Sequence, residues 1–104
     1  MDTHHTFPFT SGAAGPKPLG IPADVQRDPA AFELVRVWSS NDHQYFVIDA
    51  AHIEDPAAWG IVAVDLMKHA ARAHQQATGA PKGEVYKRIL AGLVAEMQDS
   101  TEEL

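Results

Sequence analysis

Residues 55–79, DPAAWGIVAVDLMKHAARAHQQATG, decide how the chain is organised. Asp55 can accept hydrogen bonds from the amides of a first helical turn, and Pro56 suits the first helical position because it has no amide to satisfy. Gly79 can adopt the left-handed backbone that closes a helix, and Pro81 cannot continue one. The stretch therefore predicts one long helix between Asp55 and Gly79.

The apolar residues of this helix recur at helical spacing and form two neighbouring strips. The main strip comprises Trp59, Val62, Ala63, Leu66, Ala70, Ala73 and Ala77, and the second comprises Gly60, Val64, Met67 and Ala71. Together they are wider than the stripe of about 100° that a surface helix buries. We therefore expect the helix to pack on two sides, with Trp59 as a core anchor and another backbone close to Gly60.

Two segments rich in β-forming residues precede the helix. Residues 32–38 (FELVRVW) and 44–50 (QYFVIDA) predict the two strands of an antiparallel hairpin. Residues 39–43 supply the turn, with Asn41-Asp42 at its tip. Large apolar side chains alternate onto both faces of both strands. We expect one face to lie on the long helix, and the other is too apolar to be fully exposed to water.

A second, shorter helix is predicted over residues 84–98, and the short connection makes the two helices antiparallel neighbours. The predicted fold is therefore α+β, an antiparallel hairpin packed on two antiparallel helices in the order ββαα. A two-stranded hairpin is only marginally stable in water and has two open edges. We expect a homodimer in which a second copy completes a larger sheet, with the two hairpins joined edge to edge, or in which the two hairpins pack face to face.

The chain divides by composition into four segments. These are a disordered arm (1–17), an extended proline-rich segment that packs on the domain (18–30), the ββαα domain (31–98) and an acidic tail (99–104). Leu19 and Ile21 are the large apolar side chains of the proline-rich segment, and we expect this segment to bury them.

Charge and composition exclude several classes of protein. The chain of 104 residues has 8 basic and 14 acidic residues, and its net charge of −6 argues against nucleic acid or an anionic membrane as partner. Cysteine is absent, so the chain has neither disulfides nor a cysteine zinc site. No apolar run approaches the roughly 18 residues of a membrane span, and no signal-peptide pattern is present. A cytoplasmic protein is expected.

Three motifs together resemble a known family. They are ELVRVW at 33–38, DPAAWG at 55–60, and the Asp65–His69 spacing followed by Ala73. They resemble a family of short bacterial proteins described only as a domain of unknown function, over roughly residues 18–97. The resemblance supports the domain boundaries and implies no activity, cofactor or catalytic residue.

Asp65 and His69 are the first candidates for chemistry because residues four apart share one helix face. A carboxylate can orient an imidazole as a general base or a metal ligand. A metal site needs a further ligand, for which His43, His52 and Glu84 are the alternatives. The competing interpretation, which we favour, is a solvated or locally hydrogen-bonded pair, and we expect no metal site and no cofactor.

Arg36 is the second candidate, because its guanidinium could hold an anionic ligand through two hydrogen bonds. The competing interpretation is an ion pair with Glu33 or with Asp49 on the neighbouring strand. Trp59 could line a ligand site between the hairpin and the long helix.

Three functions are compatible with these features. The favoured hypothesis is a non-enzymatic, homodimeric interaction module, because catalytic motifs are absent and the hairpin and helix carry excess apolar surface. The second is a small enzyme or metal-binding protein that uses Asp65 and His69. The third is a carrier of a small apolar or anionic ligand held near Arg36 and Trp59.

Overall fold

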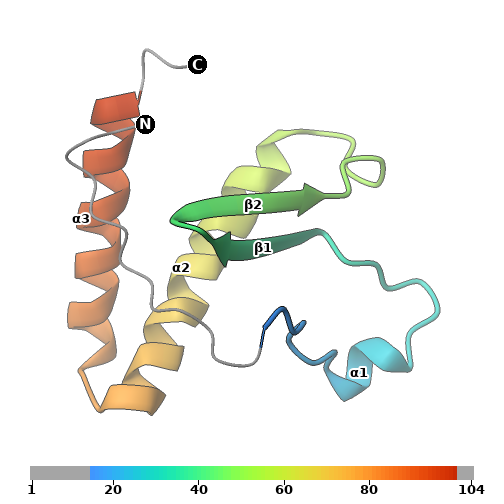
Figure 1. Cartoon of the computed structure of the whole chain (residues 1–104), viewed down its shortest axis with the longest axis horizontal. Coiled ribbons are helices and arrows are strands. Elements are labelled where there is room, and N and C mark those ends of the chain that lie inside the picture. The colour runs from blue at the N-terminus through green and yellow to red at the C-terminus, as the bar shows by residue number, and fades with distance from the viewer. Residues whose placement is uncertain (1–14, 101–104) are drawn as a thin grey trace. The chain divides into compact units, whose positions relative to one another are not determined.

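The computed structural model describes residues 15–100 of the chain. Its elements follow in the order α1 (Ala23–Gln26), β1 (Val35–Ser40), β2 (His43–Ile48), α2 (Ala57–Thr78) and α3 (Lys82–Ser100) (Figure 1). The chain divides into two compact units, Met1–Ile53 and Glu54–Leu104. The predicted α+β class and the order of a hairpin followed by two helices are confirmed.

The turn of the hairpin is tighter than predicted. Asn41 and Asp42 form its tip, as expected, and both have positive φ angles, of 51° and 61°. Two left-handed residues in succession define the turn whose twist matches that of the flanking strands, and asparagine and aspartate tolerate this conformation. Because these two residues make the whole turn, the strands extend to Ser40 and His43, which the sequence placed in the loop.

The register of the hairpin places apolar side chains on both faces, as the alternation predicts. Cross-strand partners share a face, so one face carries Val35, Val37, Phe46 and Ile48, and the other carries Arg36, Trp38, Tyr45 and Val47. The first face is wholly apolar at these positions, and the second holds one charge.

The ends of the two strands are joined beyond the ladder itself. The amide of Asp49 donates to the carbonyl of Leu34 at 3.0 Å, which extends the pairing by one step. Nδ1 of His52 donates to the Asp49 carboxylate at 2.9 Å, and the His52 ring stacks on Phe32 with the ring centroids 4.3 Å apart. Residues 32–34, predicted to begin the first strand, therefore lie at the open end of the hairpin without belonging to β1.

The segment before the hairpin is not extended throughout, which corrects the prediction for residues 18–30. It contains the single helical turn α1, preceded by Pro22 in an extended conformation. Gln26 Nε2 donates to the Ile21 carbonyl at 2.9 Å, and Arg27 pairs with Asp24 one turn earlier. A helix of four residues is too short to show apolar periodicity, so only its local hydrogen bonds reveal it.

The burial of Leu19 and Ile21 by this segment was wrongly predicted. Leu19 is 94% exposed and Ile21 is 61% exposed. Both residues lie outside the helices and strands, and no described sheet or helix covers their side chains. Most of the predicted arm, residues 1–14, and residues 101–104 of the predicted tail lie outside the described residues.

The long helix α2 begins and ends where its sequence signals predict. The Asp55 carboxylate accepts a hydrogen bond from the Ala57 amide at 3.0 Å, and Pro56 already has helical backbone angles. Gly79 ends the helix with φ 80° and ψ 0°, and its amide donates to the Gln75 carbonyl at 2.8 Å. Local capping chemistry therefore sets both ends of α2.

The strip of α2 that is buried is not the main strip. Among the described residues only Met67 and Ala71, one turn apart on the second strip, are buried, with 8% and 1% of their surface exposed. Leu66 of the main strip is 64% exposed. Trp59, Val62 and Ala70 of the main strip are only partly buried. In its own unit α2 has one helical neighbour, α3, and two-sided packing is not found there.

The backbone expected close to Gly60 is not supplied by any of the described residues. A Cβ atom built on Gly60 meets no other atom of the described residues within 4 Å. Gly60 lies in the first turn of α2, at the end remote from the connection to α3, and the two helices diverge from that connection (Figure 1). Among residues 15–100, the site is therefore open space.

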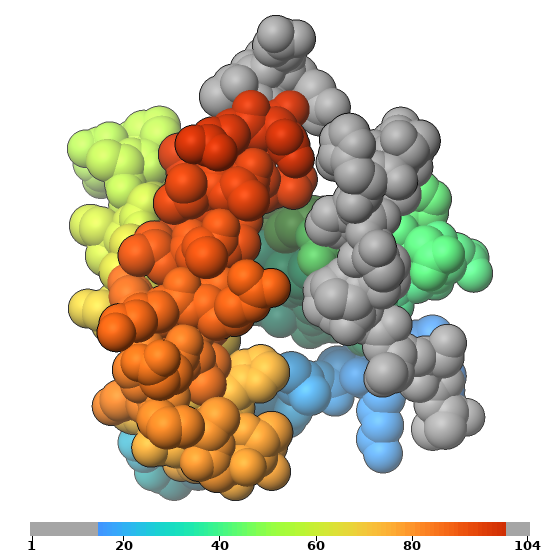
Figure 2. Space-filling view, turned by 90° about the vertical axis from the view of Figure 1, so that its left-hand side faces the viewer, coloured from blue at the N-terminus to red at the C-terminus, as the bar shows by residue number. Residues whose placement is uncertain are grey.

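Helix α3 runs antiparallel to α2 after a connection of three residues. The two helices contact each other (Figure 2). Val85, Tyr86 and Ile89 of α3 are partly buried. It has 19 residues against 22 in α2, so it is the shorter helix, as predicted. It continues to Ser100, so the predicted tail begins later than residue 99.

Candidate functional site

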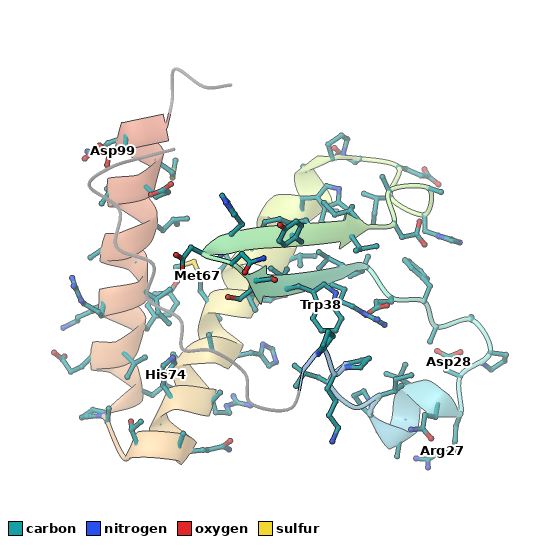
Figure 3. The ribbon with its side chains drawn as sticks, in the orientation of Figure 1. Arg27, Asp28, Trp38, Met67, His74 and Asp99 are labelled. Atoms are coloured by element: carbon teal, nitrogen blue, oxygen red, sulfur yellow. The ribbon has the colours of Figure 1, made fainter. Side chains whose placement is uncertain are left out.

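The first unit contains an open groove of about 660 Å³ beside strand β1. Segment 17–22 and α1 form one side, and residues 31–38 form the other. Trp38 projects from β1 toward this segment (Figure 3). The groove is lined by Lys17, Pro18, Leu19, Gly20, Ile21, Pro22, Val25, Gln26, Ala31, Phe32, Glu33, Val35, Arg36, Val37 and Trp38. Its walls are mainly apolar, with charge supplied by Lys17, Glu33 and Arg36.

Arg36 lies in this groove and is engaged by Glu33. Its Nε and one terminal nitrogen donate to the two carboxylate oxygens of Glu33 at 3.0 and 2.9 Å, so both oxygens of the acid are used. These hydrogen bonds, with the negative charge of Glu33, raise the pKa of the Arg36 guanidinium. The guanidinium carbon also lies 6.0 Å from the centre of the Trp38 ring, within the range of a cation–π contact. Of the two acids open to Arg36, Glu33 is the partner, while Asp49 pairs with His52.

Asp65 and His69 belong to the second unit, on the exposed side of α2. Nδ1 of His69 lies 2.8 Å from the backbone carbonyl of Asp65. A carbonyl oxygen only accepts, so Nδ1 is the donor of this hydrogen bond. The imidazole thus contacts the backbone of Asp65, because a ring four residues on can turn back to the preceding helical turn.

Trp59, the remaining candidate, lies partly buried in the first turn of α2. It lies before Asp65 and His69 on the same helix and in the same unit, whereas Arg36 lies in the other unit. The structure thus joins Asp65 to His69 and Arg36 to Glu33 and Trp38.

Two features of the site were missed in the sequence. One is the role of Trp38 and Phe32 as walls of the groove, and the other is the stack of His52 on Phe32. The ELVRVW motif held a signal for the role of Trp38. Alternate residues of a strand share a face, and Trp38 is two residues from Arg36, so the two side chains could have been placed together. The stack joins residues 20 apart, and no local pattern indicates it.

Within residues 15–100, no group of three or more histidine, aspartate or glutamate side chains is placed to hold a metal ion. The same residues include no helix long and apolar enough to span a membrane.

These features define a small α+β chain with a hairpin unit, which holds an apolar groove, and a two-helix unit. The chain belongs to the family described as Domain of unknown function (DUF5076), whose model matches residues 18–101. This confirms the resemblance found in the sequence.

Among solved structures, the chain is similar to one from the photosynthetic bacterium Rhodopseudomonas palustrus, described as that of a "putative pyruvate dehydrogenase". The two are 29% identical with a TM-score of 0.65, over 84% of this chain and 88% of that one. No curated protein matches the chain.

Proposed function

We propose that the chain is a non-enzymatic, cytoplasmic, homodimeric interaction module. The observation that carries this proposal is the exposure of the hairpin. Val37, Tyr45, Phe46, Val47 and Ile48 are all between 48% and 62% exposed, and they occupy both faces of a sheet with only two strands. Soluble monomers rarely expose contiguous apolar patches of more than a few hundred Å². A second protein surface is the simplest cover for these side chains.

The charge balance adds to this proposal. With a net charge of −6, the chain suits neither a nucleic acid nor an anionic membrane, so its partner surface is a protein. The dehydrogenase name belongs to the neighbouring structure, and no contact described for residues 15–100 favours that activity over an interaction module.

The proposal is tested by light scattering over a concentration series. Wild-type chain at micromolar concentration should have twice the mass of one chain. Phe46→Lys, which adds a charge to the face of Val35, Val37 and Ile48, should shift the mass toward that of the monomer. Leu19→Lys is the matched control because Leu19 is 94% exposed and lies outside the hairpin, so its dimer should persist. A wild-type monomer at all concentrations would refute the proposal, and circular dichroism establishes that each variant folds.

A second candidate, a carrier of a small ligand, is favoured by the groove beside β1. A volume of about 660 Å³ lies within the usual range for small-molecule sites, and the walls are mainly apolar. Glu33 already occupies the guanidinium of Arg36, so an apolar ligand suits the groove better than an anion. Asp65 and His69, the candidates for an enzyme or metal protein, do not line this groove.

A further inference from the structure

Strand β2 is the less protected edge of the hairpin. All six residues of β2 are exposed, whereas Val35 and Trp38 of β1 are partly buried. Natural edge strands are commonly protected by lysine, proline or a bulge. β2, with the sequence HQYFVI, has none of these, and its pairing with β1 is continuous from Val35↔Ile48 to Ser40↔His43.

The two-residue turn determines which backbone groups point away from the hairpin. Residues on either side of such a turn exchange hydrogen bonds, so Ser40↔His43, Trp38↔Tyr45 and Arg36↔Val47 are the bonded pairs. The bond from the Asp49 amide to the Leu34 carbonyl fits the same alternation. The amides and carbonyls of Gln44, Phe46 and Ile48 therefore face outward along the free edge of β2.

The outer edge of β1 differs in its surroundings. Segment 17–22 and α1 lie along it across the groove, and β1 lies between them and β2 (Figure 1). β1 also carries Arg36, which is paired with Glu33 and is the one charged residue in the ladder apart from histidine. A flanking segment and a charged side chain on the strand both hinder the addition of a further strand.

We propose that a second copy of this chain adds through β2, antiparallel to it and with Phe46 opposite Phe46 of the partner subunit. The inference rests on the proposed function, since it names the surface through which the homodimer forms. The joined sheet has four strands in the order β1-β2-β2-β1, with the two-fold axis passing between the central strands.

This register gives hydrogen-bond partners to more of the outward backbone groups of β2 than a register centred on either neighbouring residue. Gln44 stands opposite Ile48 of the partner subunit, so every outward amide and carbonyl from Gln44 to Ile48 has a partner within the strand. Moving the centre by one residue, to Tyr45 or Val47, places outward groups against the turn or beyond the end of β2.

Charge and apolar surface agree with the same register. His43 stands opposite Asp49 of the partner subunit. The Asp49 carboxylate already accepts hydrogen bonds from His52 Nδ1 and from the Ala51 amide, and its remaining lone pairs can accept from the His43 imidazole, so each end of the interface pairs an imidazole with a carboxylate. Both copies present the same face on the same side of the sheet. The apolar face of Val35, Val37, Phe46 and Ile48 is thereby doubled into one continuous surface.

A single introduced cysteine tests the edge directly because the chain has no cysteine of its own. Phe46→Cys places two thiols across the proposed axis, within disulfide reach, and should give a covalent dimer under mild oxidation. Val37→Cys is the matched control, since Val37 is directly opposite Phe46, on the same face and comparably exposed. Its two copies would be three strand spacings apart, about 14 Å, too far for a disulfide.

Hydrogen exchange of the wild-type chain provides a second measurement that needs no substitution. The outward amides of Gln44, Phe46 and Ile48 should exchange roughly tenfold more slowly when concentration lowers the monomer fraction tenfold. The outward amides of Val37 and Ser39 should be unaffected.

The results separate the inference from the proposed function. A covalent dimer with Val37→Cys instead of Phe46→Cys, or protection of β1 in place of β2, would overturn the inference and place the interface at β1. A dimer by light scattering with neither crosslink and no protection at either edge would also overturn it, while the homodimer itself would stand. A monomer would refute both.

Discussion

Substituting alanine for glycine at Gly60 and at Gly79 should change stability in opposite directions. Gly60 has helical backbone, and an added Cβ meets no described atom within 4 Å. Alanine there should raise the free energy of unfolding by about 0.5–1 kcal/mol, because it loses less backbone entropy on folding. Gly79 has φ 80°, where an L side chain collides with the following carbonyl. Alanine there should lower the free energy of unfolding by about 1–2 kcal/mol.

Thermal melts over a concentration series measure both effects. For a chain of this size, 1 kcal/mol corresponds to a shift of about 4–8 °C in the melting temperature. Gly92→Ala is the control because Gly92 is also helical, in the middle of α3, with no atom within 4 Å of an added Cβ. It should stabilise the chain as Gly60→Ala does.

The reasoning would be refuted if Gly60→Ala lowered the melting temperature while Gly92→Ala raised it. That result would mean that a partner chain approaches Gly60, the contact that the sequence suggested and the single chain lacks. A Gly79→Ala variant as stable as the parent would mean that α2 can end without its left-handed residue.

Two further predictions concern packing and the groove. Met67→Ala should lower the free energy of unfolding by about 2–5 kcal/mol, because Met67 is only 8% exposed. Leu66→Ala should cost much less in dilute solution, because Leu66 is 64% exposed. Urea unfolding measures both variants, and equal losses would show that the main strip of α2 is buried. Glu33→Gln should release the guanidinium of Arg36 from its ion pair. Titration with acetate, followed by NMR, should then shift the Nε resonance of Arg36 in the variant but not in wild type. An equal shift in both would show that the pair with Glu33 does not block anions.

The parts of this protein that the sequence determined are those with local causes. Asp55 and Gly79 bound α2 because a carboxylate can reach the amide two residues on and a glycine can turn left-handed, and neither effect needs a distant partner. Asn41 and Asp42 mark the hairpin turn for the same reason. The alternation of apolar side chains in the strands likewise predicted a hairpin with two apolar faces.

Only the tertiary structure decided which of several apolar residues of α2 is buried and which of two acids pairs with Arg36. Met67 and Leu66 are both apolar positions of α2, and only the placement of the neighbouring elements selects Met67 for burial. Arg36 had two acids within reach, and the geometry of the chain at the open end of the hairpin gives it Glu33. Periodicity records which side chains can be buried, whereas burial and pairing are relations between segments distant in sequence, so they exist only once the chain has folded.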